Sequence, residues 1–122
     1  MNNRYPKKEK LKSKKLIGEL FEKGESITVY PIRLVYLQTL YNGDVNLKAG
    51  VSVSKKQFKR AVERNLIKRL LRESFRKLKP QYFNNITTHY AFMFLYIGDT
   101  KPTFAEVNEK MKALLDKFSA SI

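Results

Sequence analysis

The chain has 122 residues, which is enough for one domain with a single modest core and too few for two. Its 25 Lys and Arg residues outnumber its 11 Asp and Glu residues and give a formal net charge of +14. Self-repulsion of that size is usually offset by a polyanionic partner, so nucleic acid and an anionic membrane surface are the candidates. The absence of cysteine excludes disulfides, a thiolate nucleophile and a zinc finger.

The first residues, MNNRYPKKEKLKSKK, are basic but lack the apolar segment of a secretory signal. No apolar run approaches the roughly 20 residues of a membrane span, so we expect a cytoplasmic protein with no membrane partner. Residues 1–12 are expected to form a basic arm. Residues 13–122 are expected to form a single domain, because no repeat and no linker-like composition divides them.

The first predicted element is a short helix capped by Ser13, with Gly24 as the residue beyond its C-terminus. Its apolar residues share one face: Leu16, Ile17, Leu20 and Phe21. From Ile27 to Tyr41 the pattern is extended, with an interruption at Pro31. In this stretch Ile32, Leu34 and Tyr36 alternate with Arg33, Val35 and Leu37.

Asn42-Gly43 then predicts a hairpin, because a type I′ turn needs positive φ at both of its central positions. Beyond the turn, apolar residues alternate with polar or small ones, as in a strand with one buried face: Val45, Leu47, Ala49, Val51 and Val53. A long helix is expected from about Gln57 to Lys79, ended by Pro80.

The continuous apolar run YAFMFLYI, residues 90–97, is typical of a strand that is covered on both faces. Thr103 and Glu106 then form the pattern of a capping box, which predicts a closing helix. Its apolar stripe comprises Phe104, Val107, Met111, Leu114, Leu115 and Phe118. The element order α-β-β-β-α-β-α indicates an α+β fold in which helices pack on one central sheet of about four strands.

The long central helix has an unusual distribution of charge. Residues 55–79 contain eleven Lys and Arg residues and only two acids, Glu63 and Glu73, a balance of +9. At 100° per residue, Arg64, Lys68, Arg72 and Arg76 form a ridge, which we expect on the side opposite the core stripe, with Asn65 and Arg69 beside it. The core stripe is expected to comprise Ile67, Leu70, Leu71, Ser74 and Leu78.

Like charges at i, i+4 repel, and a solubilising helix would mix the two signs, so the ridge favours a phosphate backbone over a merely solvated face. The preceding segment SKKQFKR adds Lys55, Lys56, Lys59 and Arg60 where the strand meets the helix. Free N–H groups at a helix start also attract phosphate.

The motifs GVSVSKK, AVERN, IKRLLRE and FR resemble the signature of the bacterial ribonuclease P protein subunit. That family has Ser-Lys-Lys at the end of a strand and Ala-Val-x-Arg-Asn-Arg-x-Lys-Arg-x-x-Arg-Glu on a long helix. Ile17, Phe21, Gly24 and Tyr36 also match its pattern, and the resemblance covers roughly residues 11–118. The chain departs from the pattern at Leu66, which stands in place of an Arg, and in the loop QFKR, which is one residue longer.

The resemblance implies that the catalyst is a partner RNA, that Mg²⁺ acts in the RNA-containing holoenzyme, and that the enzyme removes the 5′ leader of precursor tRNA. The basic ridge and junction would dock on the catalytic RNA, which makes residues 13–122 an RNA-binding domain. A cleft between the first helix and the sheet would hold the leader through Ile17, Phe21, Arg33 and Tyr36. The resemblance also implies a left-handed strand–helix–strand crossover, an exception to the usual right-handed rule.

Some readings of single residues stay open at this point. Phe21 has the spacing of a core residue as well as of a cleft residue, and Asn65 suits a local backbone contact as well as RNA. His89 is the single histidine, and no close Asp/Glu pair suggests a two-metal nuclease site, so we expect no catalytic residue and no metal site in the protein.

Three other functions remain as alternatives. A structural RNA-binding protein of the ribosomal type shares this charge and size, and copurification with ribosomal RNA would favour it. A protein-only nuclease would be active without added RNA. A DNA-binding protein would prefer duplex DNA to structured RNA at equal salt. In the reading that we favour, no protein partner is required.

Overall fold

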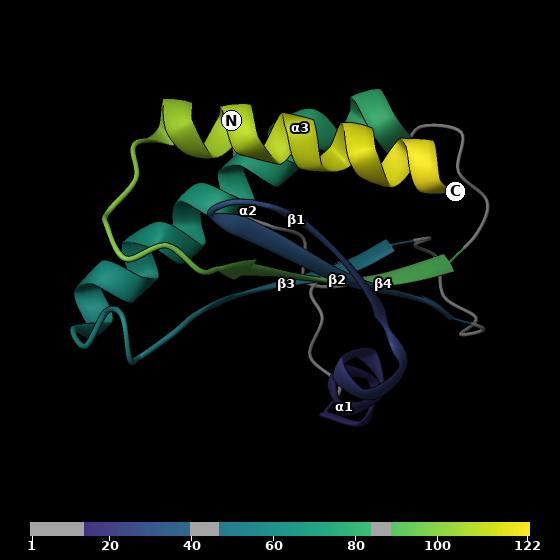
Figure 1. Cartoon of the computed structure of the whole chain (residues 1–122), viewed down its shortest axis with the longest axis horizontal. Coiled ribbons are helices and arrows are strands. Elements are labelled where there is room, and N and C mark those ends of the chain that lie inside the picture. Colours follow the sequence, from purple (N-terminus) through teal and green to yellow (C-terminus); the bar gives the residue numbers. More distant parts are fainter. Residues whose placement is uncertain (1–13, 40–46, 84–88) are drawn as a thin grey trace.

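The computed structural model describes residues 14–39, 47–83 and 89–122 (Figure 1). In chain order its elements are α1 (Lys14–Lys23), β1 (Glu25–Val29), β2 (Ile32–Thr39), β3 (Leu47–Val53), α2 (Ala61–Phe83), β4 (His89–Tyr96) and α3 (Phe104–Ser121). This order confirms the prediction from the sequence. The predicted cap Ser13, the basic arm and the Asn42-Gly43 turn lie outside the described residues.

The four strands form one mixed sheet in the order β1-β2-β4-β3. β2 pairs antiparallel with both β1 and β4, and β3 pairs parallel with β4. The predicted hairpin between β2 and β3 is therefore wrong, because β4 lies between these two strands. β4 is apolar on both faces, and the central position in the sheet buries both of them.

The β3-α2-β4 segment is a βαβ unit, since parallel neighbouring strands are joined through a helix. Its left-handedness remains a prediction of the resemblance.

Helices cover the two faces of the sheet unequally. α2 and α3 lie together on one face, and α1 lies on the other (Figure 1). The larger core, between the sheet and the helix pair, contains Phe75, Phe92, Phe94 and Phe118. The smaller core under α1 is formed by Leu20, Val35, Ala91 and Met93.

α2 differs from its prediction at both ends. It begins at Ala61, because residues 54–60 form a turn in which the Phe58 N–H bonds to the Ser54 carbonyl at 3.1 Å. It also continues past Pro80, which was predicted to end it, as far as Phe83. The Phe83 ring is buried against Phe75, Phe92 and Phe118, so packing compensates for the hydrogen bond that proline removes.

The start of α3 matches its prediction. Thr103 Oγ1 accepts from the Glu106 N–H at 3.2 Å, and Glu106 Oε1 accepts from the Thr103 N–H at 2.8 Å, which completes the capping box. Below it, Val107, Met111 and Leu114 are buried as expected.

Gly24 follows α1, and its N–H bonds to the Leu20 carbonyl at 2.9 Å. No residue in the described chain has positive φ, so the glycine is not needed for a left-handed cap. A Cβ at this position would lie 2.3 Å from the Leu20 carbonyl oxygen and 2.9 Å from that of Tyr36. The position therefore needs glycine because two backbone segments approach each other closely.

Candidate RNA-binding surfaces

The connection between β3 and α2 presents four cations to solvent. The side chains of Lys55, Lys56, Lys59 and Arg60 are exposed. Between them Phe58 is 4% exposed, and its ring centroid lies 6.0 Å from that of Tyr96. This buried aromatic residue, which the sequence analysis did not recognise, anchors the connection to the end of β4. We refer to residues 54–60 as the basic junction.

Arg64 holds the basic junction in shape. Its Nη1 donates to the carbonyl oxygens of Phe58 and Lys59, each at 2.8 Å. The side chain is half-buried, so these bonds are partly shielded from water. A guanidinium that donates to two adjacent carbonyls has fewer N–H groups left for phosphate than a free one. The structure therefore gives Arg64 a positioning function that charge spacing alone does not reveal.

The remaining cations run along the flank of α2. The sequence analysis expected them on the side opposite the buried stripe, and that expectation is wrong. Phe75 is also buried and turns the core face toward the ridge, so that Arg64, Lys68 and Arg76 are half-buried while Arg72 is exposed. Arg72 borders a small cavity with Ala49, Val51, Phe75 and Phe94, which places its stem beside the edge strand β3. Its guanidinium remains available to an anion.

Both acidic residues of α2 form ion pairs with cations. Arg69 Nε lies 3.4 Å from Glu73 Oε1, and Lys101 Nζ lies 3.4 Å from Glu63 Oε2. Because the cations of both pairs are largely exposed, each pair contributes at most about 1 kcal/mol to stability. Asn65, between these groups, is exposed.

A different surface lies over α1. Phe21 is 51% exposed, which decides between its two readings against core packing. Ile17 is half-buried against the smaller core, and the exposed Arg33 donates to Ser26 Oγ at 3.3 Å. These three residues belong to the α1 side of the molecule.

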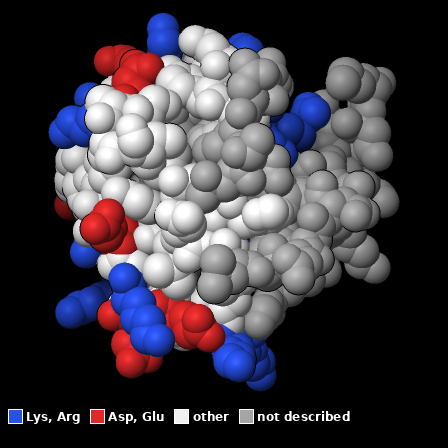
Figure 2. All heavy atoms as spheres, turned by 90° about the vertical axis from the view of Figure 1, so that its right-hand side faces the viewer, with Lys and Arg blue, Asp and Glu red and all other residues white. Residues whose placement is uncertain are grey.

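Charge on this side is mixed. Lys14, Lys15 and Lys23 share α1 with Glu19 and Glu22. Figure 2 shows blue and red side chains together along the lower rim, where α1 lies. The α1 side should therefore attract phosphate less strongly than the basic junction does.

Tyr36, the fourth residue of the expected cleft, does not lie on the α1 side with Ile17, Phe21 and Arg33. Its ring is 9% exposed and packs on the opposite face of the sheet, with its centroid 4.9 Å from that of Phe118. The expected cleft that contains both Phe21 and Tyr36 is thus corrected, because alternation along β2 points Val35 toward α1 and Tyr36 away from it. The Tyr36 hydroxyl donates to Glu25 Oε2 at 3.0 Å. Burial and, to a smaller extent, this hydrogen bond raise the pKa of Tyr36.

The hydroxyl end of Tyr36 borders a cavity of about 490 Å³ at the end of the sheet. The cavity is lined by Lys23, Glu25, Tyr36, Leu37, Gln38, Tyr90, Ser121 and Ile122. Among the described residues, Tyr36 therefore borders this opening and not the α1 surface.

The described residues contain no group of three or more His, Asp or Glu side chains placed to hold a metal ion. His89 begins β4 and is half-buried. None of the described helices is both long and apolar enough to span a bilayer.

Comparison with known proteins shows the family to which the chain is similar. A family model described as Ribonuclease P matches residues 5–119. The chain is 33% identical over 120 residues to the Ribonuclease P protein component of Porphyromonas gingivalis strain ATCC 33277, covering 95% of this chain and 87% of the relative. It is 31% identical over 134 residues to that of Chlorobium phaeobacteroides, covering 98% and 90%.

Solved structures show the same fold. The RNase P protein of Staphylococcus aureus superimposes with a TM-score of 0.72 at 21% identity, over 90% of this chain and 94% of that one. The RNase P protein of Thermotoga maritima superimposes with a TM-score of 0.70 at 24% identity, over 89% and 96%.

Proposed function

This chain belongs to the Ribonuclease P family and is a protein subunit of that endoribonuclease, which acts in tRNA 5′ processing; we propose that it works by holding two RNAs on separate surfaces. Family membership implies partnership with the RNA subunit of ribonuclease P. The basic junction and the flank of α2 bind that catalytic RNA, and the α1 surface binds the 5′ leader of precursor tRNA. We expect the complex in the cytoplasm, where precursor tRNA is processed.

The observation that carries this proposal is the exposure of four cations on a rigid connection. Phe58 and Arg64 fix the backbone of the basic junction, so Lys55, Lys56, Lys59 and Arg60 project from a shaped loop. Lys68, Arg69, Arg72 and Arg76 continue the positive potential along α2, beside Asn65. Phosphate contacts of this kind position an RNA without reading its sequence.

We assign no cleavage step to the protein. Its described acids are dispersed and do not fit a metal-dependent nuclease site. Mg²⁺ would act in the RNA-containing holoenzyme, where it would supply the metal-ion chemistry of phosphodiester hydrolysis. The protein residues bind and orient the RNAs.

Reconstitution tests the proposal directly. The purified chain, the RNA subunit and precursor tRNA are combined at low Mg²⁺, and each is omitted in turn. Cleavage of the leader from precursor tRNA is expected only when both the chain and the RNA subunit are present. Cleavage by the chain without RNA would support a protein-only nuclease, and copurification with ribosomal RNA instead would favour the structural RNA-binding alternative.

The leader site is tested by Phe21→Ala. Loss of one base stack should weaken precursor binding to the holoenzyme by about 5- to 150-fold, corresponding to about 1–3 kcal/mol, and should spare mature tRNA, which has no leader. Because Phe21 is half-exposed, the variant should keep its thermal stability. Equal losses for precursor and mature tRNA would remove Phe21 from the leader site.

Tyr36→Ala is the informative comparison. Tyr36 is buried against Phe118, so truncation should cost about 3–5 kcal/mol of folding free energy and impair every RNA contact together. Tyr36→Phe keeps the ring and removes only the bond to Glu25. A selective loss of precursor affinity in Tyr36→Phe would assign the hydroxyl to the leader, through the cavity at the sheet end.

A further inference from the structure

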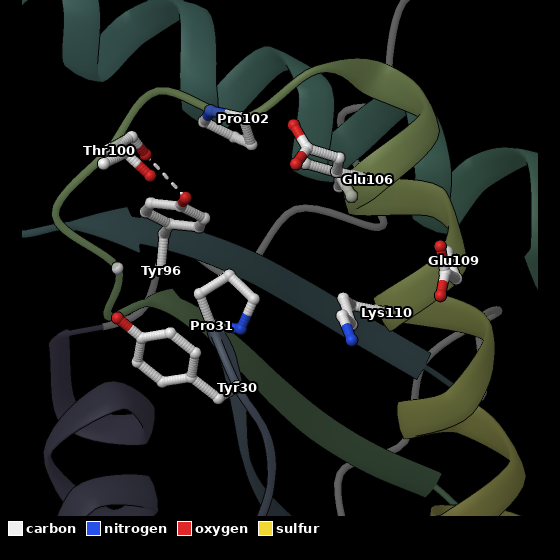
Figure 3. A pocket seen from close by; sticks show the side chains of 10 residues that line it. Tyr30, Pro31, Tyr96, Thr100, Pro102, Glu106, Glu109 and Lys110 are labelled. Atoms are coloured by element: carbon white, nitrogen blue, oxygen red, sulfur yellow. Dashed lines mark hydrogen bonds between the residues drawn. The ribbon is translucent and has the colours of Figure 1, made fainter.

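A second cavity lies at the other end of the sheet, outside both proposed RNA surfaces. It has a volume of about 360 Å³ and opens between the β1–β2 turn, the end of β4 and the start of α3 (Figure 3). That volume is near the lower limit of small-molecule sites, which start at roughly 300 Å³. Its lining includes Tyr30, Pro31, Tyr96, Pro102, Glu109 and Lys110.

The apolar walls of the cavity are formed by rings. Tyr30 is 62% exposed at the mouth and offers a free aromatic face, while Tyr96 is 3% exposed and forms an inner wall. The Tyr96 hydroxyl donates to the Thr100 carbonyl at 2.7 Å, which fixes this ring in place. Pro31 and Pro102 add apolar surface to the cavity lining (Figure 3).

The charged part of the cavity lining consists of two carboxylates, Glu106 and Glu109, and one ammonium group, Lys110. Glu106 caps α3, and the backbone hydrogen bond from Thr103 lowers its pKa, so this carboxylate is charged at neutral pH. No hydrogen bond or ion pair joins Glu109 to another residue that the structure describes. Because the capping box occupies the start of α3 and two carboxylates lie there, a phosphate is disfavoured and a donor group is favoured.

The cavity and the basic junction share one end of the sheet. Val53, which ends β3, pairs with Tyr96, and the Phe58 ring of the junction contacts the Tyr96 ring. Lys101, in the loop beside the cavity, reaches Glu63 on α2. Neighbouring strands are about 4.8 Å apart, so the basic junction and the cavity lie at the ends of adjacent strands.

We propose that this cavity binds an unpaired nucleobase bearing an exocyclic amino group, from an RNA strand whose phosphates lie on the basic junction. The base stacks on Tyr30 and donates its amino group to Glu109, in the way that proteins read splayed single-stranded bases. The proposal rests on the proposed function and adds a base-binding site to its phosphate-binding surface. A Lys or Arg side chain of a protein partner is the competing occupant, because aromatic rings and carboxylates also attract cations.

Photo-crosslinking locates the occupant. Tyr30→p-benzoylphenylalanine is assembled with the RNA subunit, with and without precursor tRNA, and each RNA is labelled in turn. Crosslinking to one or a few unpaired nucleotides is expected, and the labelled RNA that reacts identifies the source of the base. The same amino acid at Lys117, exposed on α3, should not give these crosslinks. Assembly of an active holoenzyme without an RNA crosslink at position 30 would overturn the base site and leave the proposed function intact.

Variants then test the chemistry with short oligonucleotides of A, C or U. The wild-type chain should bind the A and C oligomers more tightly than U, which has no amino group. Tyr30→Ala should weaken A and C binding by about 5- to 150-fold. Glu109→Gln should reduce the preference for the A and C oligomers over U, whereas Asp116→Asn, the same charge change on the same helix and outside both proposed RNA surfaces, should keep it. A preference that survives Tyr30→Ala and Glu109→Gln contradicts the proposal, as does tighter binding of an Arg-rich peptide than of any oligonucleotide at this site.

Discussion

Arg64 combines a place in the basic ridge with a local structural contact. Its spacing places it in the basic ridge, yet its guanidinium bonds to two consecutive carbonyls of the junction. Both bonds come from Nη1, whose two N–H groups lie at a fixed angle in the guanidinium plane, whereas the lysine ammonium is a compact point charge on a flexible stem. Charge and shape can therefore be separated at this position by a conservative substitution.

We predict that Arg64→Lys weakens binding of the RNA subunit although the formal charge is unchanged. Loss of the two carbonyl bonds should also lower the folding free energy by about 1–3 kcal/mol. Binding isotherms at several salt concentrations and thermal unfolding provide the measurements. Arg69→Lys is the matched control, because Arg69 is exposed and forms an ion pair with Glu73 on the same helix. If Arg64→Lys bound the RNA as the wild type does, the positioning function would be wrong.

At the scale of elements, α2 has one side that packs in the core and one flank that is basic. Its apolar side packs on β3 and α3, and its basic flank faces solvent, so one rotation of the helix fixes both surfaces. The buried residues Ile67, Leu71 and Phe75 set that rotation. A substitution that disturbs the packing of these buried residues would therefore also displace the cations on the helix.

Leu71→Asp should therefore destabilise the fold by several kcal/mol, because Leu71 is completely buried and a carboxylate would have no partner there. Leu66→Asp introduces the same group five residues earlier, where the side chain is 43% exposed, and should change stability by less than about 1 kcal/mol. Chemical denaturation of both variants gives the comparison. Similar losses at the two positions would show that the helix is rotated differently.

The end of α2 is tied to α3 by a hydrogen bond. The Tyr82 hydroxyl donates to Asp116 Oδ1 at 2.5 Å, and burial together with this carboxylate raises the pKa of Tyr82 to about 12. Since the unfolded value is about 10, this contribution to stability is complete below pH 10. It is lost as the pH rises from about 10 through about 12.

Tyr82→Phe should consequently lose less stability over that range than the wild type, while being less stable at pH 8. Urea denaturation at pH 8, 10 and 11.5 measures the difference. Tyr30→Phe, at a tyrosine that is 62% exposed, serves as the control and should follow the wild type. A parallel decline of the wild type and Tyr82→Phe would contradict the assignment.

For the whole molecule, the net charge of +14 predicts RNA affinity that depends strongly on salt, because bound phosphates release counterions. Replacing both Lys55 and Lys56 by Ala should flatten the plot of log affinity against log salt by about one to two units. Arg64→Lys should weaken binding at the same slope. Equal slopes for the wild type and the double variant would exclude these lysines from phosphate contact.

The element order, the capping box at Thr103 and the buried β4 could all be predicted from the sequence, because each depends on local periodicity or on hydrogen bonds between near neighbours. The cations of the basic junction and the motif resemblance were equally visible. These features identify the family, and residues 5–119 match its model.

Tertiary structure decided what depends on distant partners. β4 separates β2 from β3 because its two apolar faces require cover on both sides, a constraint that no hairpin motif contains. Helix α2 runs past Pro80 because Phe83 finds an aromatic core. Tyr36 faces away from Phe21, and Arg64 turns back to its own junction, since side-chain direction follows from which faces are buried and not from residue type.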